Sequence, residues 1–326
     1  MGRRLAIFTW GGLGNTVMAL PLINALRQSL GDEYLIMLPQ PGFACLISPP
    51  GNSIRMASLS GNFVSALAEL VSFRPDVVLS SLPYPKWRYG LIAAMSGART
   101  RIGDSGFPNR LLNVTIDTAA RATHFVERNL ALLKPLGIKN PGIVFHIPIS
   151  QEASLRAERF LHDQGVSSFI AIHPGAGNPL RRWPMENFRR LCAALGSQGK
   201  SVVILAGPSE GQLVDQLSSG LDFKPAICRG SLSQLLPILA RARALVAVDS
   251  GLAHSAAALS VPTIALMGPS DQEVYRPYGK HVRVLTNQVP CRPCYRPGGR
   301  IRCPHRRRLC LDIEVDRVLA CLEMMI

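Results

Sequence analysis

Residues 244–271, ALVAVDSGLAHSAAALSVPTIALMGPSD, join a buried strand to a helix and that helix to a second strand. The first apolar run ends at Asp249, a small turn follows at Ser250 and Gly251, and the next residues are mostly alanine. A second apolar run covers 261–269, and the sequence MGPSD, residues 267–271, ends the stretch. Strand, helix and strand at this spacing predict a parallel βαβ unit with a right-handed crossover.

The same alternation runs through the whole chain. In the N-terminal half, apolar runs predict strands over 4–10, 33–39, 75–81 and 99–104, and helical periodicity predicts helices over 16–30, 65–73, 91–98 and 124–137. In the C-terminal half, strands are predicted over 168–174, 201–207, 225–228, 244–250 and 261–269, and helices over 153–165, 184–199, 210–219, 232–243 and 252–260. This pattern predicts an α/β protein with doubly wound parallel sheets.

The segment 140–151, NPGIVFHIPISQ, is the best candidate for a linker, because it is rich in Pro and Gly and has no helical period. A chain of 326 residues also suits two domains of about 150 residues each. We therefore predict one domain over 1–150 and another over 151–310, with ligand-binding strand edges on either side of a cleft. A final helix within 311–326 is expected to pack back on the first domain.

The net charge of +15, from 36 basic and 21 acidic residues, predicts attraction to anions. The stretch from Val274 to Leu311 contains no Asp or Glu but contains Arg276, Lys280, Arg283, Arg292, Arg296, Arg300, Arg302, Arg306, Arg307 and Arg308. It is either an arginine-rich solvated surface or the site of an anionic partner. Nucleic acid is not the partner we expect, since only 6% of residues are aromatic and no nucleic-acid-binding module is recognisable.

The apolar run near the N-terminus is too short and too broken by glycine to be a secretory signal, and no run is long enough to span a membrane. We therefore expect a cytoplasmic protein, free or peripheral at the inner face of the membrane. Four of its eight cysteines, Cys291, Cys294, Cys303 and Cys310, are spaced C-x2-C-x8-C-x6-C. The first pair would suit a structural metal ion. We favour ordinary thiols in an irregular tail, and we predict no cofactor.

Three loops of the C-terminal half carry groups suited to a nucleoside diphosphate. In HPGAGNPLRRWP, Gly175 and Gly177 on either side of Ala176 let backbone amides approach an anion, and Arg181 and Arg182 supply positive charge. The turn at Ser250 and Gly251 opens a helix, whose unpaired amides and dipole favour an anion, and His254 lies one turn further on. Glu210, in GPSE, is either a helix-end carboxylate or an acceptor for ribose hydroxyls.

The glycine-rich turn GGLGNTVMALP, residues 11–21, is a weaker nucleotide site. A dinucleotide fingerprint needs a third glycine where Val17 stands, and no acid follows the second predicted strand. A Walker motif is absent as well. These departures argue against NAD and ATP as ligands of this turn.

Several segments resemble the heptosyltransferase family of bacterial glycosyltransferases. They are HPGAGNPLRRWPMENF, AGPSE, VDSGLAHSAAALSVPTIALMGPSDQEVYRPYG, the N-terminal GGLGNTVMALPLINALR and the cysteine-bearing CRPCYRPGGRIRCPHRRRLCLDIEVDRVL. The resemblance covers nearly the whole chain and is most specific at D-[ST]-G-L-x-H followed by G-P-[ST]-D.

This resemblance implies a GT-B fold and inverting, metal-independent transfer of a sugar from a nucleotide donor, which is ADP-heptose in the best-known members. The usual acceptor is the growing lipopolysaccharide core, an anionic glycolipid. On the matching positions, Arg181 would contact the diphosphate, Glu210 the ribose and Asp249 the transferred sugar. The donor side also includes Gly175 and Ala176, and the amides of Ser250 and Gly251, with His254, would hold the phosphates.

The sequence departs from the family at one position. The helix after the glycine turn commonly opens there with Asp, which is taken to be the catalytic base, whereas this chain has Asn15, and an amide accepts no proton near neutral pH. Gly12, Gly14, Asn15 and Asp104 are our acceptor-side residues. Asn15 would orient the acceptor while Asp104 or His124 takes the proton, or catalysis proceeds without a strong base; a plain helix N-cap is the structural alternative for Asn15.

The prediction is thus a glycosyltransferase that moves a sugar, heptose by preference, to a lipopolysaccharide-core or related glycan, with Asn15 and Arg181 as catalytic-site residues. Two alternatives stay open. One is a sugar-nucleotide epimerase or hydrolase on the same fold. The other is a non-catalytic binder of nucleotide sugar or glycan, which the missing carboxylate at position 15 favours.

Overall fold

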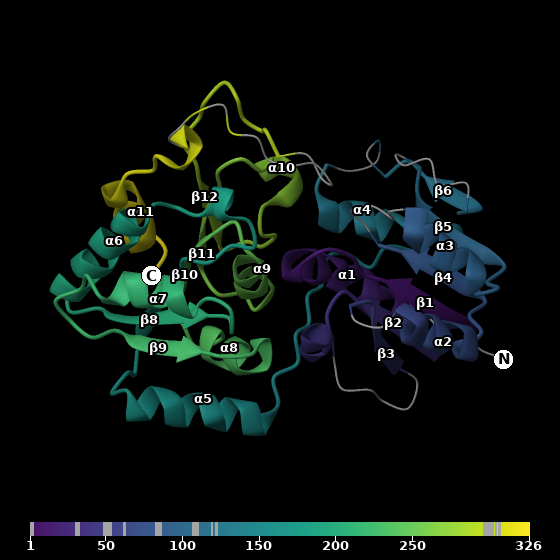
Figure 1. Cartoon of the computed structure of the whole chain (residues 1–326), viewed down its shortest axis with the longest axis horizontal. Helices are drawn as coiled ribbons and strands as arrows, with labels where there is room; N and C mark the ends of the chain where they lie inside the picture. The colour runs from purple at the N-terminus through teal and green to yellow at the C-terminus, as the bar shows by residue number, and fades with distance from the viewer. Residues whose placement is uncertain are drawn as a thin grey trace. The chain divides into compact units, whose positions relative to one another are not determined.

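The computed structural model describes residues 3–29, 33–47, 54–60, 63–81, 87–105, 111–118, 120, 123–295, 303, 305 and 308–326. The chain divides into two compact units, Met1–Pro148 and Ile149–Ile326. Figure 1 draws the first mostly in purple and blue and the second in teal to yellow. The division falls at residue 148, close to the boundary predicted at 150. Among the described residues, no helix has the length and apolar character needed to cross a bilayer.

The first unit is built on a parallel sheet. Its strands are β1 (Arg4–Phe8), β2 (Glu33–Leu38), β3 (Ile54–Ser58), β4 (Val77–Ser80), β5 (Thr100–Asp104) and β6 (Val114–Ile116). Its helices are α1 (Leu13–Ser29), α2 (Phe63–Phe73), α3 (Trp87–Met95) and α4 (Phe125–Ala131), with the short turns η1 (Pro41–Leu46) and η2 (Lys134–Leu136). Alternate strand residues such as Ala6 and Phe8 pack with α2 and α3.

The second unit repeats this plan. Its strands are β7 (Phe169–His173), β8 (Ser201–Ala206), β9 (Ala226–Arg229), β10 (Ala244–Val248), β11 (Thr263–Leu266) and β12 (Val282–Leu285). Its helices are α5 (Gln151–Asp163), α6 (Met185–Ser197), α7 (Gly211–Ser218), α8 (Leu232–Leu239), α9 (Gly251–Ala258), α10 (Gln272–Tyr275) and α11 (Val315–Glu323), with η3 (Pro179–Arg181) and η4 (Leu309–Leu311).

Both sheets have the same strand order within the described residues. The first runs β3-β2-β1-β4-β5-β6, and the second runs β9-β8-β7-β10-β11-β12 when read from its other edge. Each order is 3-2-1-4-5-6 in its own unit, the order of Rossmann sheets, and such sheets bind ligands beyond the carboxyl ends of the strands where the order reverses. That switch point lies between β1 and β4 in the first unit and between β7 and β10 in the second.

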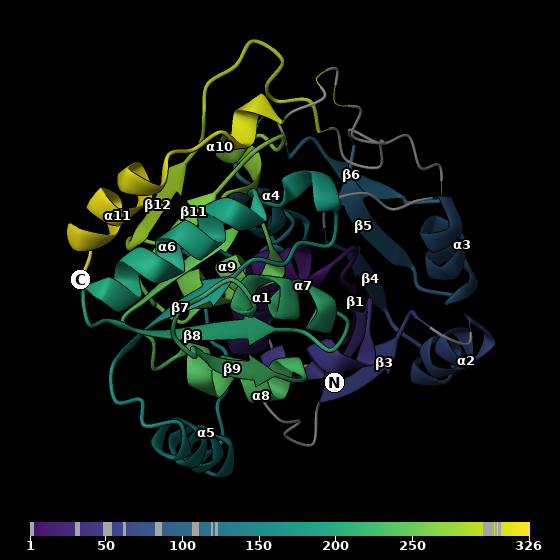
Figure 2. The same ribbon diagram turned by 60° about the vertical axis from the view of Figure 1, so that its left-hand side comes forward.

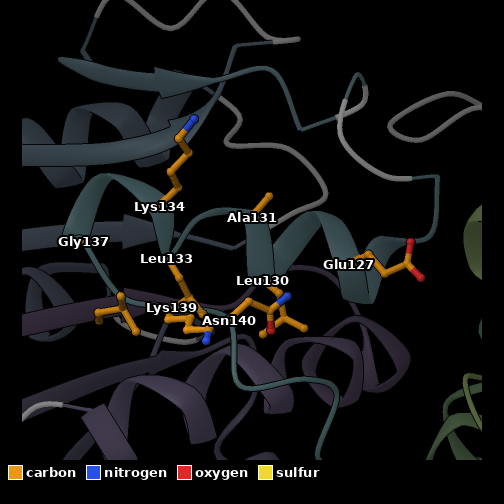
Figure 3. A pocket seen from close by; sticks show the side chains of 9 residues that line it. Glu127, Leu130, Ala131, Leu133, Lys134, Gly137, Lys139 and Asn140 are labelled. Atoms are coloured by element: carbon orange, nitrogen blue, oxygen red, sulfur yellow. The ribbon is translucent and has the colours of Figure 1, made fainter.

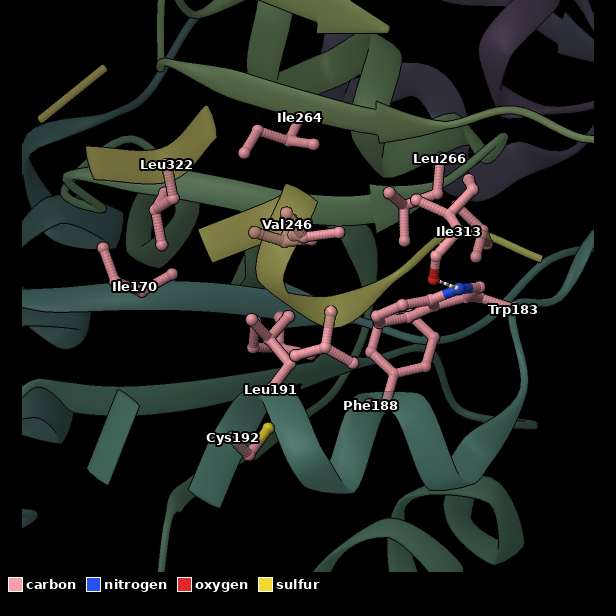
Figure 4. Packing of buried hydrophobic residues seen from close by; sticks show 14 of the residues in the cluster. Ile170, Trp183, Phe188, Leu191, Cys192, Val246, Ile264, Leu266, Ile313 and Leu322 are labelled. Carbon is pink, nitrogen blue, oxygen red and sulfur yellow. Dashed lines mark hydrogen bonds between the residues drawn. The ribbon is translucent and has the colours of Figure 1, made fainter. Parts of the chain in front are cut away.

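Alternation along the strands of the second unit builds a hydrophobic layer on each face of its sheet. Ile170 and Val246 face α6, α7 and α11, whereas Ala171 and Leu245 face α5, α8 and α9. Figure 4 shows the first of these layers, in which the indole of Trp183 donates a hydrogen bond to the carbonyl of Ile313, at 3.2 Å. This bond ties the C-terminal segment to the layer.

The C-terminal helix differs from our expectation. We expected it to pack on the first unit, but α11 belongs to the second unit and buries Val318 and Leu322 in the layer that contains α6. Figure 2 shows α11, in yellow, beside α6. The reason is the apolar stripe of α11, whose side chains pack with those of α6 in one buried cluster of the second unit.

Candidate functional site

The switch point of the second unit brings two of the predicted loops together. The register pairs Ala247 of β10 with His173 of β7, so the chain leaves both strands at the same edge. The loop after β7 contains Gly175 and Ala176, and the loop after β10 contains Asp249 and Ser250. The sheet therefore places backbone amides and a carboxylate at one edge, as the strand pattern predicts.

Asp249 is the centre of the charged groups at this edge. Its side chain is 4% exposed, and its Oδ2 lies 3.4 Å from Nη1 of Arg181, the last residue of η3. The hydroxyl of Ser270, in the loop after β11, donates to the same oxygen at 2.5 Å. A cation and a hydroxyl thus both contact the buried carboxylate of Asp249. Sequence reasoning quoted the MGPSD loop but assigned no role to Ser270.

The N-terminus of α9 presents polar atoms that have no partner among the described residues. They are Oγ of Ser250 and Nδ1 of His254, and in the neighbouring β7–α6 loop Nε of Arg181 and Nε of Arg182. Buried polar atoms are nearly always hydrogen-bonded, so a group of unpaired ones indicates a place for a polar ligand. The first amides of α9 and its dipole favour an anion there.

His254 is neutral at this site. Burial lowers the pKa of His254 to about 4; the carboxylate of Asp249 opposes that shift, and the cation of Arg181 adds to it. The imidazole therefore offers a hydrogen bond near neutral pH but no net charge. The positive charge of the site comes from the arginines.

Glu210 is held against the β7 loop. Its Oε2 accepts the amide of Gly207 at 2.7 Å, and its carboxylate lies so close to Gly175 that a Cβ atom there would be 1.8 Å from Oε1. Glu210 stands at the N-cap position of α7 without a capping hydrogen bond, and both interpretations of it, a carboxylate at the helix dipole and a ribose acceptor, stay predictions. Glu210, Ala176 and Arg182 line a pocket of about 370 Å³. A carboxylate in a polar pocket can accept hydrogen bonds from the hydroxyl groups of a ligand.

The glycine turn of the first unit lies at the other switch point. Gly11 has φ +78°, and a Cβ atom there would be 2.1 Å from Nδ2 of Asn15, so this close approach requires glycine. The helix α1 begins at Leu13, which places Gly14 and Asn15 inside its first turn and Gly12 just before it. The N-cap alternative for Asn15 is therefore wrong, because the chain turns into the helix earlier than expected. No residue of this first turn is acidic.

The two alternative bases differ in their hydrogen bonds. Asp104, at the end of β5, accepts the amide and the hydroxyl of Thr118 on one oxygen, Oδ1, at 3.1 and 2.9 Å. His124 is 3% exposed, and its Nδ1 accepts the amide of Val126 at the start of α4 at 3.2 Å. The lone pair of His124 Nδ1 thus accepts the hydrogen bond that caps α4. Both hydrogen bonds from Thr118 go to Oδ1 of Asp104, so its Oδ2 can accept from another partner.

A second pocket, of about 700 Å³, lies in the first unit along α4 and η2. Figure 3 shows the side chains of Glu127 and Lys134 pointing in different directions at this pocket, with Lys139 near Leu133. Its lining carries both signs of charge and, among the described residues, no buried polar side-chain atom without a partner. It therefore lacks the features that mark the second unit's edge as a ligand site.

The four clustered cysteines are all thiols: Cys310 is buried and the other three are half-buried. Burial and the neighbouring thiols raise the pKa of Cys294 and of Cys310. Among the described residues, no three Cys, His, Asp or Glu side chains form a group able to hold a metal ion. Of the basic stretch, Arg296, Arg300, Arg302, Arg306 and Arg307 lie outside the described residues.

Comparison with known proteins agrees with this geometry. The sequence pattern of glycosyltransferase family 9 (heptosyltransferase) matches residues 86–303. Lipopolysaccharide heptosyltransferase 3 of Escherichia coli K12 is 26% identical over 290 residues, 82% of this chain and 83% of that protein. Lipopolysaccharide heptosyltransferase 1 of Pseudomonas aeruginosa is 36% identical over 158 residues, 48% of this chain and 44% of that protein.

Two solved structures show the same fold. A family 9 glycosyltransferase from Veillonella parvula superposes with a TM-score of 0.82 at 22% identity, over 99% of this chain and 97% of that one. ADP-heptose lipopolysaccharide heptosyltransferase II of E. coli gives 0.78 at 22% identity, over 99% and 98%. The predicted GT-B architecture of two doubly wound Rossmann-like units is confirmed. The chain belongs to glycosyltransferase family 9, the heptosyltransferase family, and is a glycosyltransferase.

Proposed function

We propose that this enzyme transfers a heptose from ADP-heptose to a lipopolysaccharide-core glycan, with inversion at the anomeric carbon and without a metal ion. The single observation that carries the donor site is the group of unpartnered buried polar atoms at the switch point of the second unit, on Arg181, Arg182, Ser250 and His254. Family membership supports the sugar, since the related proteins named above are lipopolysaccharide heptosyltransferases.

In this proposal the second unit holds the donor. The diphosphate lies at the N-terminus of α9, where the amides of Ser250 and Gly251 and the neutral His254 donate to it, and Arg181 balances its charge. Beside Gly175 and Ala176, the carboxylate of Glu210 accepts hydrogen bonds from the ribose hydroxyls. The carboxylate of Asp249 accepts hydrogen bonds from hydroxyls of the heptose. These fixed donors stabilise the negative charge that grows on the leaving ADP, which is the charge a metal ion would otherwise balance.

The first unit holds the acceptor. A hydroxyl of the acceptor forms the new bond to the anomeric carbon, the bond from that carbon to the phosphate oxygen breaks, and the hydroxyl proton goes to a base. Asn15 cannot take that proton, and Nδ1 of His124 is already occupied. We infer that Asn15, beside Gly12 and Gly14, orients the acceptor and that Oδ2 of Asp104 receives the proton.

The acceptor also sets where the enzyme works. A lipopolysaccharide core carries phosphate, and a net charge of +15 favours encounter with an anionic surface. We propose a cytoplasmic enzyme that contacts the inner face of the membrane peripherally. Co-sedimentation with vesicles of anionic and of neutral lipid tests this point, and equal binding to both would contradict it.

The decisive experiment follows ADP release from ADP-heptose with and without a heptose-deficient lipopolysaccharide. We expect release that depends on the acceptor and stops in Asp104→Asn. Release without the acceptor would indicate a hydrolase instead. Product with retained configuration by NMR, or activity abolished by EDTA and restored by a divalent metal, would contradict inversion or metal independence.

The missing carboxylate favours one other function, a protein that binds the nucleotide sugar without turnover. Asn15→Asp separates the two cases. A large gain in rate would mean that the native chain lacks its base, whereas an unchanged rate together with inactive Asp104→Asn would place the base at Asp104. Tight binding of ADP-heptose with no turnover in any variant would support the binder.

A further inference from the structure

The cysteine-bearing segment over 291–295 is fastened to a loop of the donor site. Arg292 donates from Nε to the carbonyl of Gly268 at 2.6 Å and from Nη2 to that of Ser270 at 3.2 Å. The amides of Cys294 and Tyr295 both donate to the carbonyl of Pro269, at 3.1 and 3.0 Å. Because Ser270 is the hydroxyl partner of Asp249, this segment supports the backbone that holds the site's carboxylate.

The same segment places an aromatic ring on the arginine of the site. The guanidinium carbon of Arg181 lies 4.3 Å from the centre of the Tyr295 ring. The Tyr295 ring in turn meets the edge of Tyr275, with ring centres 5.9 Å apart and planes at 65°. Arg181 is thus confined twice, by an aromatic face and by the carboxylate of Asp249 at 3.4 Å.

The ion pair with Asp249 and the ring of Tyr295 restrain Arg181 in different ways. An ion pair fixes one edge of a guanidinium but allows its plane to turn, whereas a stacked ring fixes the plane. The ring also attracts the cation without adding negative charge, so it does not repel an incoming diphosphate as a second carboxylate would. An arginine ordered before binding loses less side-chain entropy when it meets its ligand.

We propose that Tyr295 is a positioning residue for donor binding: its ring orients Arg181 so that the Nε–H, which has no partner among the described residues, points at the diphosphate. This inference rests on the proposed function, because it takes Arg181 to be the group that binds the diphosphate. It gives the cysteine-bearing segment a role in the donor site that needs no metal ion.

The test compares Tyr295→Leu, which removes the ring, with Tyr295→Phe, which keeps the ring and removes only the hydroxyl. ADP is titrated calorimetrically into each variant of the full chain. We expect about a fivefold weaker Kd for Tyr295→Leu, the size of one partly exposed cation–π contact, and an unchanged Kd for Tyr295→Phe. In an Arg181→Gln background, Tyr295→Leu should cause no further loss.

A second readout does not need the ligand. The Nε–H resonance of Arg181, assigned by its absence in Arg181→Gln, should shift in Tyr295→Leu as the ring current is lost and stay in place in Tyr295→Phe. Wild-type Kd and resonance in a folded Tyr295→Leu would overturn the proposal. Equal weakening of ADP binding in both backgrounds would also overturn it, because the effect would then not pass through Arg181.

The two proposals fail in different ways. If the wild-type chain binds no ADP, the proposed function fails, and the Arg181 resonance still decides whether Tyr295 orients that guanidinium. If the wild-type chain binds ADP and Tyr295→Leu binds it equally well, only the positioning role fails.

Discussion

The two switch points of this chain have the same strand order but different chemistry. At the second, Arg181 contacts the buried carboxylate of Asp249 at 3.4 Å, and among the described residues Arg181, Arg182, Ser250 and His254 each have a buried polar atom without a partner. At the first, the buried atoms without a partner among the described residues are the neutral hydroxyls of Thr16 and Ser81, and the indole of Trp10 donates to the hydroxyl of Ser80 at 2.8 Å. The difference suits an anionic donor at one edge and the hydroxyl groups of an acceptor at the other.

We expect the largest loss of activity when the cation at the switch point of the second unit is removed. Arg181→Gln should lower kcat/KM by about 100-fold or more, because it removes a charged donor to the leaving diphosphate. It should also lower Tm, since Asp249 then lies buried without its cation. Steady-state kinetics and thermal melting measure both effects. Arg190→Gln, on the exposed side of α6, is the matched control, and an equal loss there would contradict a specific role.

The pH dependence of stability tests the burial of His254. Its folded pKa of about 4 lies below the unfolded value of 6.5, so the unfolded chain binds more protons between these values and stability falls as the pH drops through this window. The loss is on the order of 3 kcal/mol. Denaturant unfolding should show it in the wild type and in His162→Gln, an exposed control, but reduced in His254→Gln. A profile unchanged by His254→Gln would contradict the assignment.

The close approach at the donor edge gives the next effect. Gly175→Ala should displace Glu210 and weaken ADP binding about tenfold, with a loss of about 1–3 kcal/mol in unfolding free energy, as overpacking of a closed site usually does. Gly177→Ala is the matched control in the same loop, where an added Cβ meets nothing within 4 Å. Calorimetry with ADP distinguishes them, and similar Kd values would remove the argument for a tight Gly175–Glu210 contact.

The smallest expected effect belongs to the first unit. Gly11→Ala forces alanine into a left-handed backbone and displaces Asn15, at a cost of about 1 kcal/mol. We expect a several-fold lower kcat with an unchanged Kd for ADP, because the donor is held by the other unit. Gly42→Ala, in η1 of the same unit, where an added Cβ meets nothing within 4 Å, should leave both values as in the wild type. A changed Kd for ADP in Gly11→Ala would break the separation between the two edges.

The missed strands show the limit of periodicity. The central strands were predictable because both faces of each are buried, which produces continuous apolar runs such as ALVAV. The strands β3, β6 and β12 were not predicted, and each is only partly buried. All three are edge strands of their sheets, where a short segment needs fewer apolar residues.

Local patterns in the sequence are enough to predict the two α/β units, the loops at the switch points and the places of Arg181, Glu210 and Asp249 in those loops. These follow from local apolar patterns and from the rule that parallel strands share a carboxyl edge. Which groups meet is seen only in the folded chain: Ser270 contacts Asp249, Tyr295 contacts Arg181 and α11 packs on α6. Such contacts join segments distant along the chain, so they depend on packing, which no local spacing records.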